Sequence, residues 1–193
     1  EDMTIIFIVI TILNIVSFFP LFVNIHYGKH IDATMTGMAL ACFNLAGSVF
    51  TPLHAVTISK FGRKNSIMIG FVFMLLSNTM LGCMGMVQNV DWYVFFAMSC
   101  STRFIQGYGD SLAQATSMSL VGSQFPDQKN EKIGQMQATI GFGMMVGPFI
   151  GSLMYGFWGY EWAFWIFSFI LAITILLQHI YIPDELNDDG ISI

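Results

Sequence analysis

Long apolar runs separated by short polar turns dominate this sequence and restrict the folds open to it. The runs cover about residues 4–25, 34–58, 65–88, 92–121, 133–157 and 160–182. Each can cross the roughly 30 Å hydrocarbon core of a bilayer as a helix. Charged residues make up 10% of the 193 residues, which is too few to coat a soluble globule of this size. The sequence therefore predicts an all-α membrane protein with six transmembrane helices.

The first run predicts a membrane span rather than a secretory signal peptide. It is longer than a usual signal core, the acids Glu1 and Asp2 precede it, and no small-residue cleavage site follows. Asn14 within this run could line a polar pathway or hydrogen-bond to a neighbouring helix.

The cations predict the orientation of the helices. With the N-terminus inside, most cations of the connecting turns fall on that same side, and Lys29 is alone on the other. The positive-inside rule then places both ends of the segment on the cytoplasmic or matrix-equivalent side. The acidic residues 184–193 predict a solvated tail, or the start of a linker, after a domain of residues 1–183.

Several classes of site are not indicated. Cys42, Cys83 and Cys100 lie singly in apolar runs, without the paired spacing of a zinc or redox motif. His26 and His30 flank a glycine and have no clear third ligand, so a plain interfacial loop is favoured over a metal site. The spans contain no Ser/His/Asp set and no HExxH motif, and the chain lacks the basic surface of a nucleic-acid binder. We therefore expect no metal, no cofactor and no enzymatic activity.

The fourth of these runs, residues 92–121, is unusual because charges and amides lie within it. At 3.6 residues per turn one narrow stripe of a helix carries Arg103, Gln106, Asp110, Gln114 and Ser117. Such a stripe faces a bundle interior or a water-filled cavity rather than lipid. It could form a pathway for a substrate or proton, or an Arg–carboxylate pair that fastens helices. Direct pairing of the two charges would be strained, because their Cα atoms lie about 10.5 Å apart along the axis.

His54, near the inner end of the second run, allows two interpretations. Its imidazole could be a proton-sensitive group, or it could be a hydrogen-bonded structural histidine.

The turn between the second and third runs resembles the loop signature of the major facilitator superfamily. That signature is Gly, three residues, Asp, a cation, one residue, Gly and two cations. Its second half is intact here, but Ala55 and Ser59 replace the first Gly and the Asp. The candidate gating turn consists of Ser59, Lys60, Gly62, Arg63 and Lys64. In the family the Asp helps to latch the cytoplasmic side, so Ser59 puts the strength of that latch in doubt.

Two further motifs strengthen the resemblance, which covers about residues 50–165. Residues 103–109 are similar to the family's Arg-x-x-Gln-Gly-x-Gly pattern, which is linked there to proton-coupled transport. The fifth run is similar to the Gly-Pro signature of drug/proton antiporters, with Gly143, Gly147, Pro148 and Gly151. Residues 159–165 look like the turn that opens the sixth helix. Within the superfamily, the chain looks most like the vesicular amine and polyamine transporter branch.

The resemblance implies one six-helix half of a proton-coupled transporter that works by alternating access. Its cargo would be a small organic solute, such as an amine or organic cation. Asp110 would carry the proton, Arg103 would bias its proton affinity, and Gln106 and Gln114 would supply hydrogen bonds. The Gly-Pro face would serve occlusion or hinge motion, with a small-residue dimer face or static packing as the alternatives. The implied partners are the solute, the proton, the bilayer, and a second six-helix half or other membrane subunits. A structural subunit with a degenerate transporter fold is the alternative.

Overall fold

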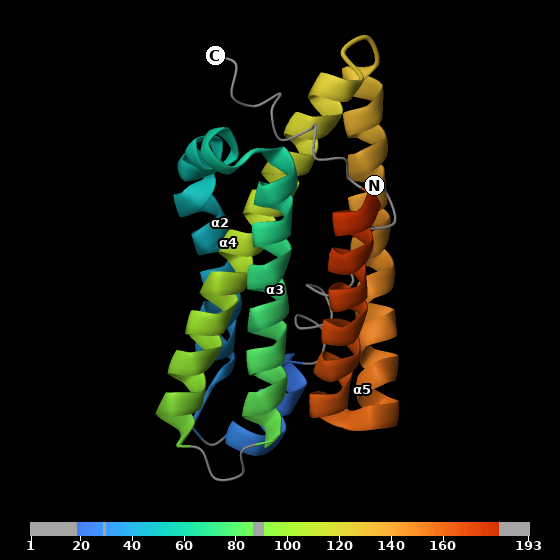
Figure 1. Cartoon of the computed structure of the whole chain (residues 1–193). Coiled ribbons are helices and arrows are strands. Elements are labelled where there is room, and N and C mark those ends of the chain that lie inside the picture. Colours follow the sequence, from blue (N-terminus) through green and yellow to red (C-terminus); the bar gives the residue numbers. More distant parts are fainter. Residues whose placement is uncertain (1–18, 29, 87–90, 182–193) are drawn as a thin grey trace.

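The computed structural model describes residues 19–28, 30–86 and 91–181, which form a helical bundle without strands among these residues (Figure 1). The long helices are α2 (Ala33–Phe61), α3 (Arg63–Met86), α4 (Trp92–Gln124) and α5 (Lys129–Tyr181). Residues 19–27 form a short helical segment at the end of the first apolar run. Asn14 and residues 184–193 lie outside the described residues.

α5 contains the fifth and sixth apolar runs as two antiparallel arms (Figure 1). The helix is broken at Gly159, whose φ is 81° and ψ is −177°. Glycine adopts this positive φ at little cost because it has no Cβ. Helical backbone continues through Pro148, so the reversal of the chain occurs at the glycine and not at the proline.

Three of the described helices, α2, α3 and α5, are long and apolar enough to cross a membrane. α4, which carries the polar stripe, is not one of these three. The described helices therefore support an all-α membrane protein, while the count of six spans stays a prediction.

An aromatic cluster holds the N-terminal helical segment against the bundle. The rings of Phe22 and Tyr160 stack with their centroids 3.8 Å apart, and those of Tyr27 and Phe95 stack at 4.5 Å. Phe22, Phe95 and Tyr160 are buried. Residues 19–27 are thus tied to the first turns of α4 and to the second arm of α5, at the end of the bundle where α5 reverses.

The opposite end of the bundle carries the cationic turns. Gly62, with φ 79°, connects α2 to α3, and Lys129 begins α5. The Arg63 Nη1 donates a hydrogen bond of 2.9 Å to Ser123 Oγ, near the end of α4. The two turns therefore lie at one end of the bundle, as expected from the distribution of the cations (Figure 1).

Candidate functional site: a buried polar network on α4

The polar stripe of α4 lies inside the bundle. Arg103, Gln106 and Asp110 are 1%, 0% and 5% exposed, and Gln114 is half-buried. These side chains avoid lipid, as expected for charged groups within a membrane. They are enclosed by neighbouring helices, so in this structure they do not form the wall of an open, wet passage.

Each charged group of the network binds an amide. Arg103 Nη1 donates to Gln106 Oε1 at 2.8 Å, and Gln114 Nε2 donates to Asp110 Oδ2 at 2.9 Å. The expectation that Arg103 and Asp110 would not pair directly agrees with these contacts. Among the described residues, the buried Arg103 Nε and Asp110 Oδ1 have no hydrogen-bond partner.

Neighbouring helices extend the network. Gln106 Nε2 donates to Asn78 Oδ1 of α3 over 3.4 Å, and Asn78 is fully buried. From α2, the Phe43 ring lies 5.1 Å from Arg103 Cζ, within the range of a cation–π contact. Sequence reasoning missed Asn78, although an amide in the middle of an apolar run is a visible signal.

We expect Asn78→Leu to destabilise the protein by about 0.6 kcal/mol, a typical value for a hydrogen bond between membrane helices. The cause is the loss of the Gln106 contact. A double-mutant cycle with Gln106→Leu, followed by thermal unfolding in detergent, measures the coupling between the two amides. Strictly additive effects of the two substitutions would contradict the contact.

The glycines that follow Gln106 bring the helix backbones together. A Cβ on Gly107 would overlap the Phe43 carbonyl of α2. A Cβ on Gly109 would lie 2.5 Å from the Gly70 carbonyl oxygen of α3, and one on Gly70 would lie 2.6 Å from the Gly109 oxygen. In this chain the two motif glycines therefore pack α4 against two different helices.

The candidate gating turn is linked to α4 by the bond from Arg63 to Ser123. Ser59 Oγ donates to the Val56 carbonyl of its own helix at 3.0 Å. Lys60 is exposed, with its Nζ 5.5 Å from the Phe61 ring centroid, whereas Lys64 is buried. The contact that position 59 makes is thus local, in line with the doubt raised by the missing Asp.

The glycines of the Gly-Pro motif share one buried face of α5. Gly143, Gly147 and Gly151 are buried, and Pro148 is half-buried. The four-residue spacing indeed places the glycines together, while their hinge role stays a prediction.

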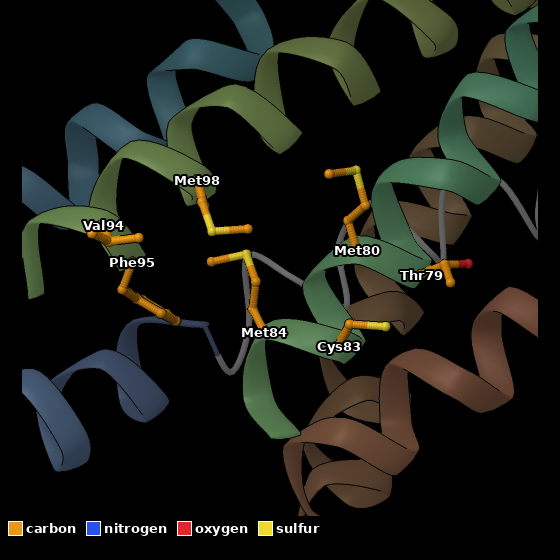
Figure 2. A pocket seen from close by; sticks show the side chains of 7 residues that line it. All are labelled: Thr79, Met80, Cys83, Met84, Val94, Phe95 and Met98. Carbon is orange, nitrogen blue, oxygen red and sulfur yellow. The ribbon is translucent and has the colours of Figure 1, made fainter. Parts of the chain in front are cut away.

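Two apolar cavities border α4 without touching the polar network. The first, of about 420 Å³, lies between α3 and α4, and Met84 and Met98 point toward one another in it (Figure 2). The second, of about 460 Å³, lies between α2, α3 and α4 and includes Phe50, Phe73 and Tyr108. Neither is lined by Arg103, Gln106, Asp110 or Gln114.

The comparisons with a family model and with individual known proteins agree on one family. The sequence model described as Major Facilitator Superfamily matches residues 4–190. The chain is 25% identical over 174 residues to the multi-drug resistance efflux pump PmrA of Streptococcus pneumoniae. It is 28% identical over 158 residues to the vesicular acetylcholine transporter of Drosophila melanogaster. It is 24% identical over 163 residues to the MFS-type transporter SLC18B1 of Homo sapiens.

These alignments cover most of this chain but a minor part of each relative. They include 89%, 81% and 84% of this chain, respectively. They span 41%, 25% and 35% of the three relatives.

Proposed function

Because this chain belongs to the major facilitator superfamily, we propose that it is part of a proton-coupled secondary transporter that moves a small organic solute. Proteins of this family are transporters rather than enzymes, and the relatives are multi-pass membrane proteins. The proposed mechanism is alternating access, in which two halves rock about a site near the midplane. The proposed orientation places the cationic turns on the cytoplasmic or matrix-equivalent side.

The proposal rests on the burial and hydrogen bonding of the Asp110 carboxyl group. It is buried within α4, Gln114 binds Oδ2, and Oδ1 has no hydrogen-bond partner among the described residues. An ionised carboxylate buried in this way is costly, whereas a proton on Oδ1 removes the charge. Asp110 is thus the proposed proton carrier.

Arg103 and the amides have supporting roles in this proposal. The Arg103 guanidinium, held by Gln106, supplies a positive charge that favours ionised Asp110, while burial favours the neutral form. These opposing effects suit a group that must both take up and release a proton. Asn14 of the first run completes the proposed pathway.

Two exposed helix faces support docking of a second half. In lipid, small and polar residues on a helix surface favour close packing against another helix. On α2 such a face carries Thr34, Gly37, Ala41, Asn44, Ser48 and Thr51, all exposed. On α5 the exposed face carries Gly134, Ala138, Gly141, Ser152 and Gly156. The proposed occupant is a second six-helix half or another membrane subunit.

The Gly-Pro motif and the turn of residues 59–64 have proposed roles in the conformational change. The buried glycine face beside Pro148 would let the first arm of α5 bend or slide, because small residues allow close and smooth helix contact. The turn of residues 59–64 would gate the cytoplasmic side through Arg63 and Ser123. Organic cations and amines are the proposed substrate class, since relatives named for multi-drug efflux and acetylcholine share this fold region.

The test is uptake into liposomes that contain the full-length gene product. We expect uptake of labelled organic amines only while a pH gradient is imposed, and collapse of the uptake by a protonophore. Gradient-independent uptake would remove the proton coupling. Absence of any uptake, together with stable co-purification in a large complex, would instead support the structural-subunit alternative.

A further inference from the structure

A second buried group faces α4 from α2. His54 is 1% exposed, and its Nε2 lies 2.8 Å from Ser111 Oγ. Its ring centroid lies 5.6 Å from that of Tyr108. The transport mechanism proposed above does not use this histidine, which lies outside the Arg103–Asp110 network.

Counting hydrogens assigns the tautomer of His54. Ser111 Oγ donates its single hydrogen to the Tyr108 carbonyl at 3.1 Å. The hydroxyl oxygen must then accept the bond from His54, so Nε2 carries the ring hydrogen. The other ring nitrogen, Nδ1, is left with a free lone pair. It is buried and has no hydrogen-bond partner in the described part of the chain.

Packing alone does not account for this arrangement. Leaving a buried acceptor unpaired costs about 1–3 kcal/mol, and a phenylalanine of similar shape would avoid that cost. The α4 segment that contacts His54 also has an unpaired buried acceptor. This acceptor is Oδ1 of Asp110, the residue next to Ser111. One unpaired acceptor thus lies on α2, where His54 meets Ser111, and the other belongs to the residue that precedes Ser111 on α4.

The charges around His54 are few. From α4, Tyr108 is in ring contact with it, and Asp110 directly precedes Ser111 in the chain. On α2 itself the nearest charged residue is Lys60, six residues further toward the cationic turn. α3 meets this region through Phe73, whose ring stacks edge-on against Tyr108 at 5.3 Å and does not titrate. Asp110 is therefore the acid closest along α4 to Ser111, the serine that His54 contacts.

We propose that His54 is a second proton-binding residue, which takes its proton at Nδ1 while Nε2–H keeps the bond to Ser111. The reaction is imidazole plus a proton from the aqueous side, giving imidazolium. The positive ring then stands beside the α4 segment that carries Asp110 and favours loss of the carboxyl proton there. The role in coupling rests on the proposed transport function, whereas proton binding at Nδ1 does not.

The α2–α4 contact gives a physical route for access to Nδ1. A Cβ on Gly47 would lie 3.6 Å from Ser111 Cβ, and Gly107 meets the Phe43 backbone directly. Beside these points of close approach, the Phe50 ring of α2 packs edge-on against the rings of Phe104 and Tyr108 of α4. A small shear of the two helices that slides these rings past one another would give water access to Nδ1.

The first test is nitrogen NMR of histidine in the full-length protein. The chain has four histidines, and His54→Gln identifies the signal of interest. We expect the Nε2–H tautomer near pH 8 and protonation of Nδ1 as the pH falls toward about 5, the range in which histidines change charge. An Nδ1–H tautomer, or no change over this range, would overturn the proposal.

The second test separates proton binding from structure. His54→Gln keeps an amide N–H that can reach Ser111 but cannot titrate in this range. We expect it to keep substrate exchange and to reduce the pH dependence of uptake from about a hundredfold per pH unit, for two bound protons, to about tenfold, for the one that Asp110 carries. His179→Gln, at an exposed position near the end of α5, is the matched control. A wild-type pH profile in His54→Gln would refute the coupling role.

The two proposals fail in different ways. If the wild-type protein shows no proton-driven uptake, the transport proposal fails and the NMR titration of His54 still stands or falls by itself. If His54→Gln does not fold, Ser111→Ala leaves the imidazole in place and removes its fixed acceptor. A single fixed tautomer that persists in Ser111→Ala would then contradict the assignment.

Discussion

Asp110→Asn is expected to abolish proton-driven uptake while substrate exchange across the membrane continues. Asparagine has nearly the same shape and can keep the Gln114 contact, but it cannot bind and release a proton. We expect uptake under a pH gradient to fall at least about 100-fold, the lower range for loss of a positioned acid–base group. Exchange of labelled for unlabelled substrate, which needs no net proton movement, measures whether the binding site survives.

The matched control is Asp91→Asn, which makes the same substitution at an exposed aspartate. Asp91 is exposed at the start of α4, where its carboxylate accepts a hydrogen bond from Tyr93 at 3.0 Å. This variant should retain full uptake. Undiminished uptake in Asp110→Asn, at equal protein in the liposomes, would remove Asp110 from the mechanism and leave it a structural role.

Gly107→Ala is expected to destabilise the bundle by about 1–3 kcal/mol, as overpacking does in other cores. The new Cβ would overlap the Phe43 carbonyl, which is backbone and cannot rotate away as a side chain could. α2 and α4 would have to separate, and this would also disturb the contact of the Phe43 ring with Arg103. Thermal unfolding of the full-length protein in detergent measures the loss.

Gly47→Ala provides the control at the same helix contact. There the added methyl group would find ordinary van der Waals distances, the nearest being 3.6 Å to Ser111 Cβ. We expect little change in stability, since alanine also favours the helix by about 1 kcal/mol relative to glycine. Equal unfolding temperatures for the two variants would mean that α2 and α4 do not approach as closely as described.

The sequence predicted the helices well because hydropathy alone marks their extent. The expected runs 34–58, 65–88 and 92–121 agree with α2, α3 and α4 to within a few residues. The break between the last two runs falls at Gly159, where the positive φ explains why the chain can turn. The number of membrane spans is harder to predict from hydropathy, because in α4 the residues of the polar stripe stand where other spans have apolar residues.

The site was predictable in its residues but not in its surroundings. Helical periodicity put Arg103, Gln106 and Asp110 on one face, and the structure shows that they are buried together. Periodicity cannot tell which neighbour that face meets. The contacts with Asn78 and Phe43 depend on how α3 and α2 cross α4, as does the bond between His54 and Ser111. Those crossings are set by backbone approach at the glycines, which a one-dimensional pattern does not reveal.

The reciprocal contact of Gly70 and Gly109 constrains how this protein can diverge. Each Cα faces the carbonyl oxygen of the other helix, so any side chain added at one position meets peptide backbone. Shortening the neighbouring side chains, Ala113 beside Gly70 and Phe73 beside Gly109, cannot create enough room, because the nearest atom in each case is a backbone oxygen. In evolution the two positions should therefore be retained as a pair, and a lineage that loses one glycine should show a rebuilt crossing of the two helices.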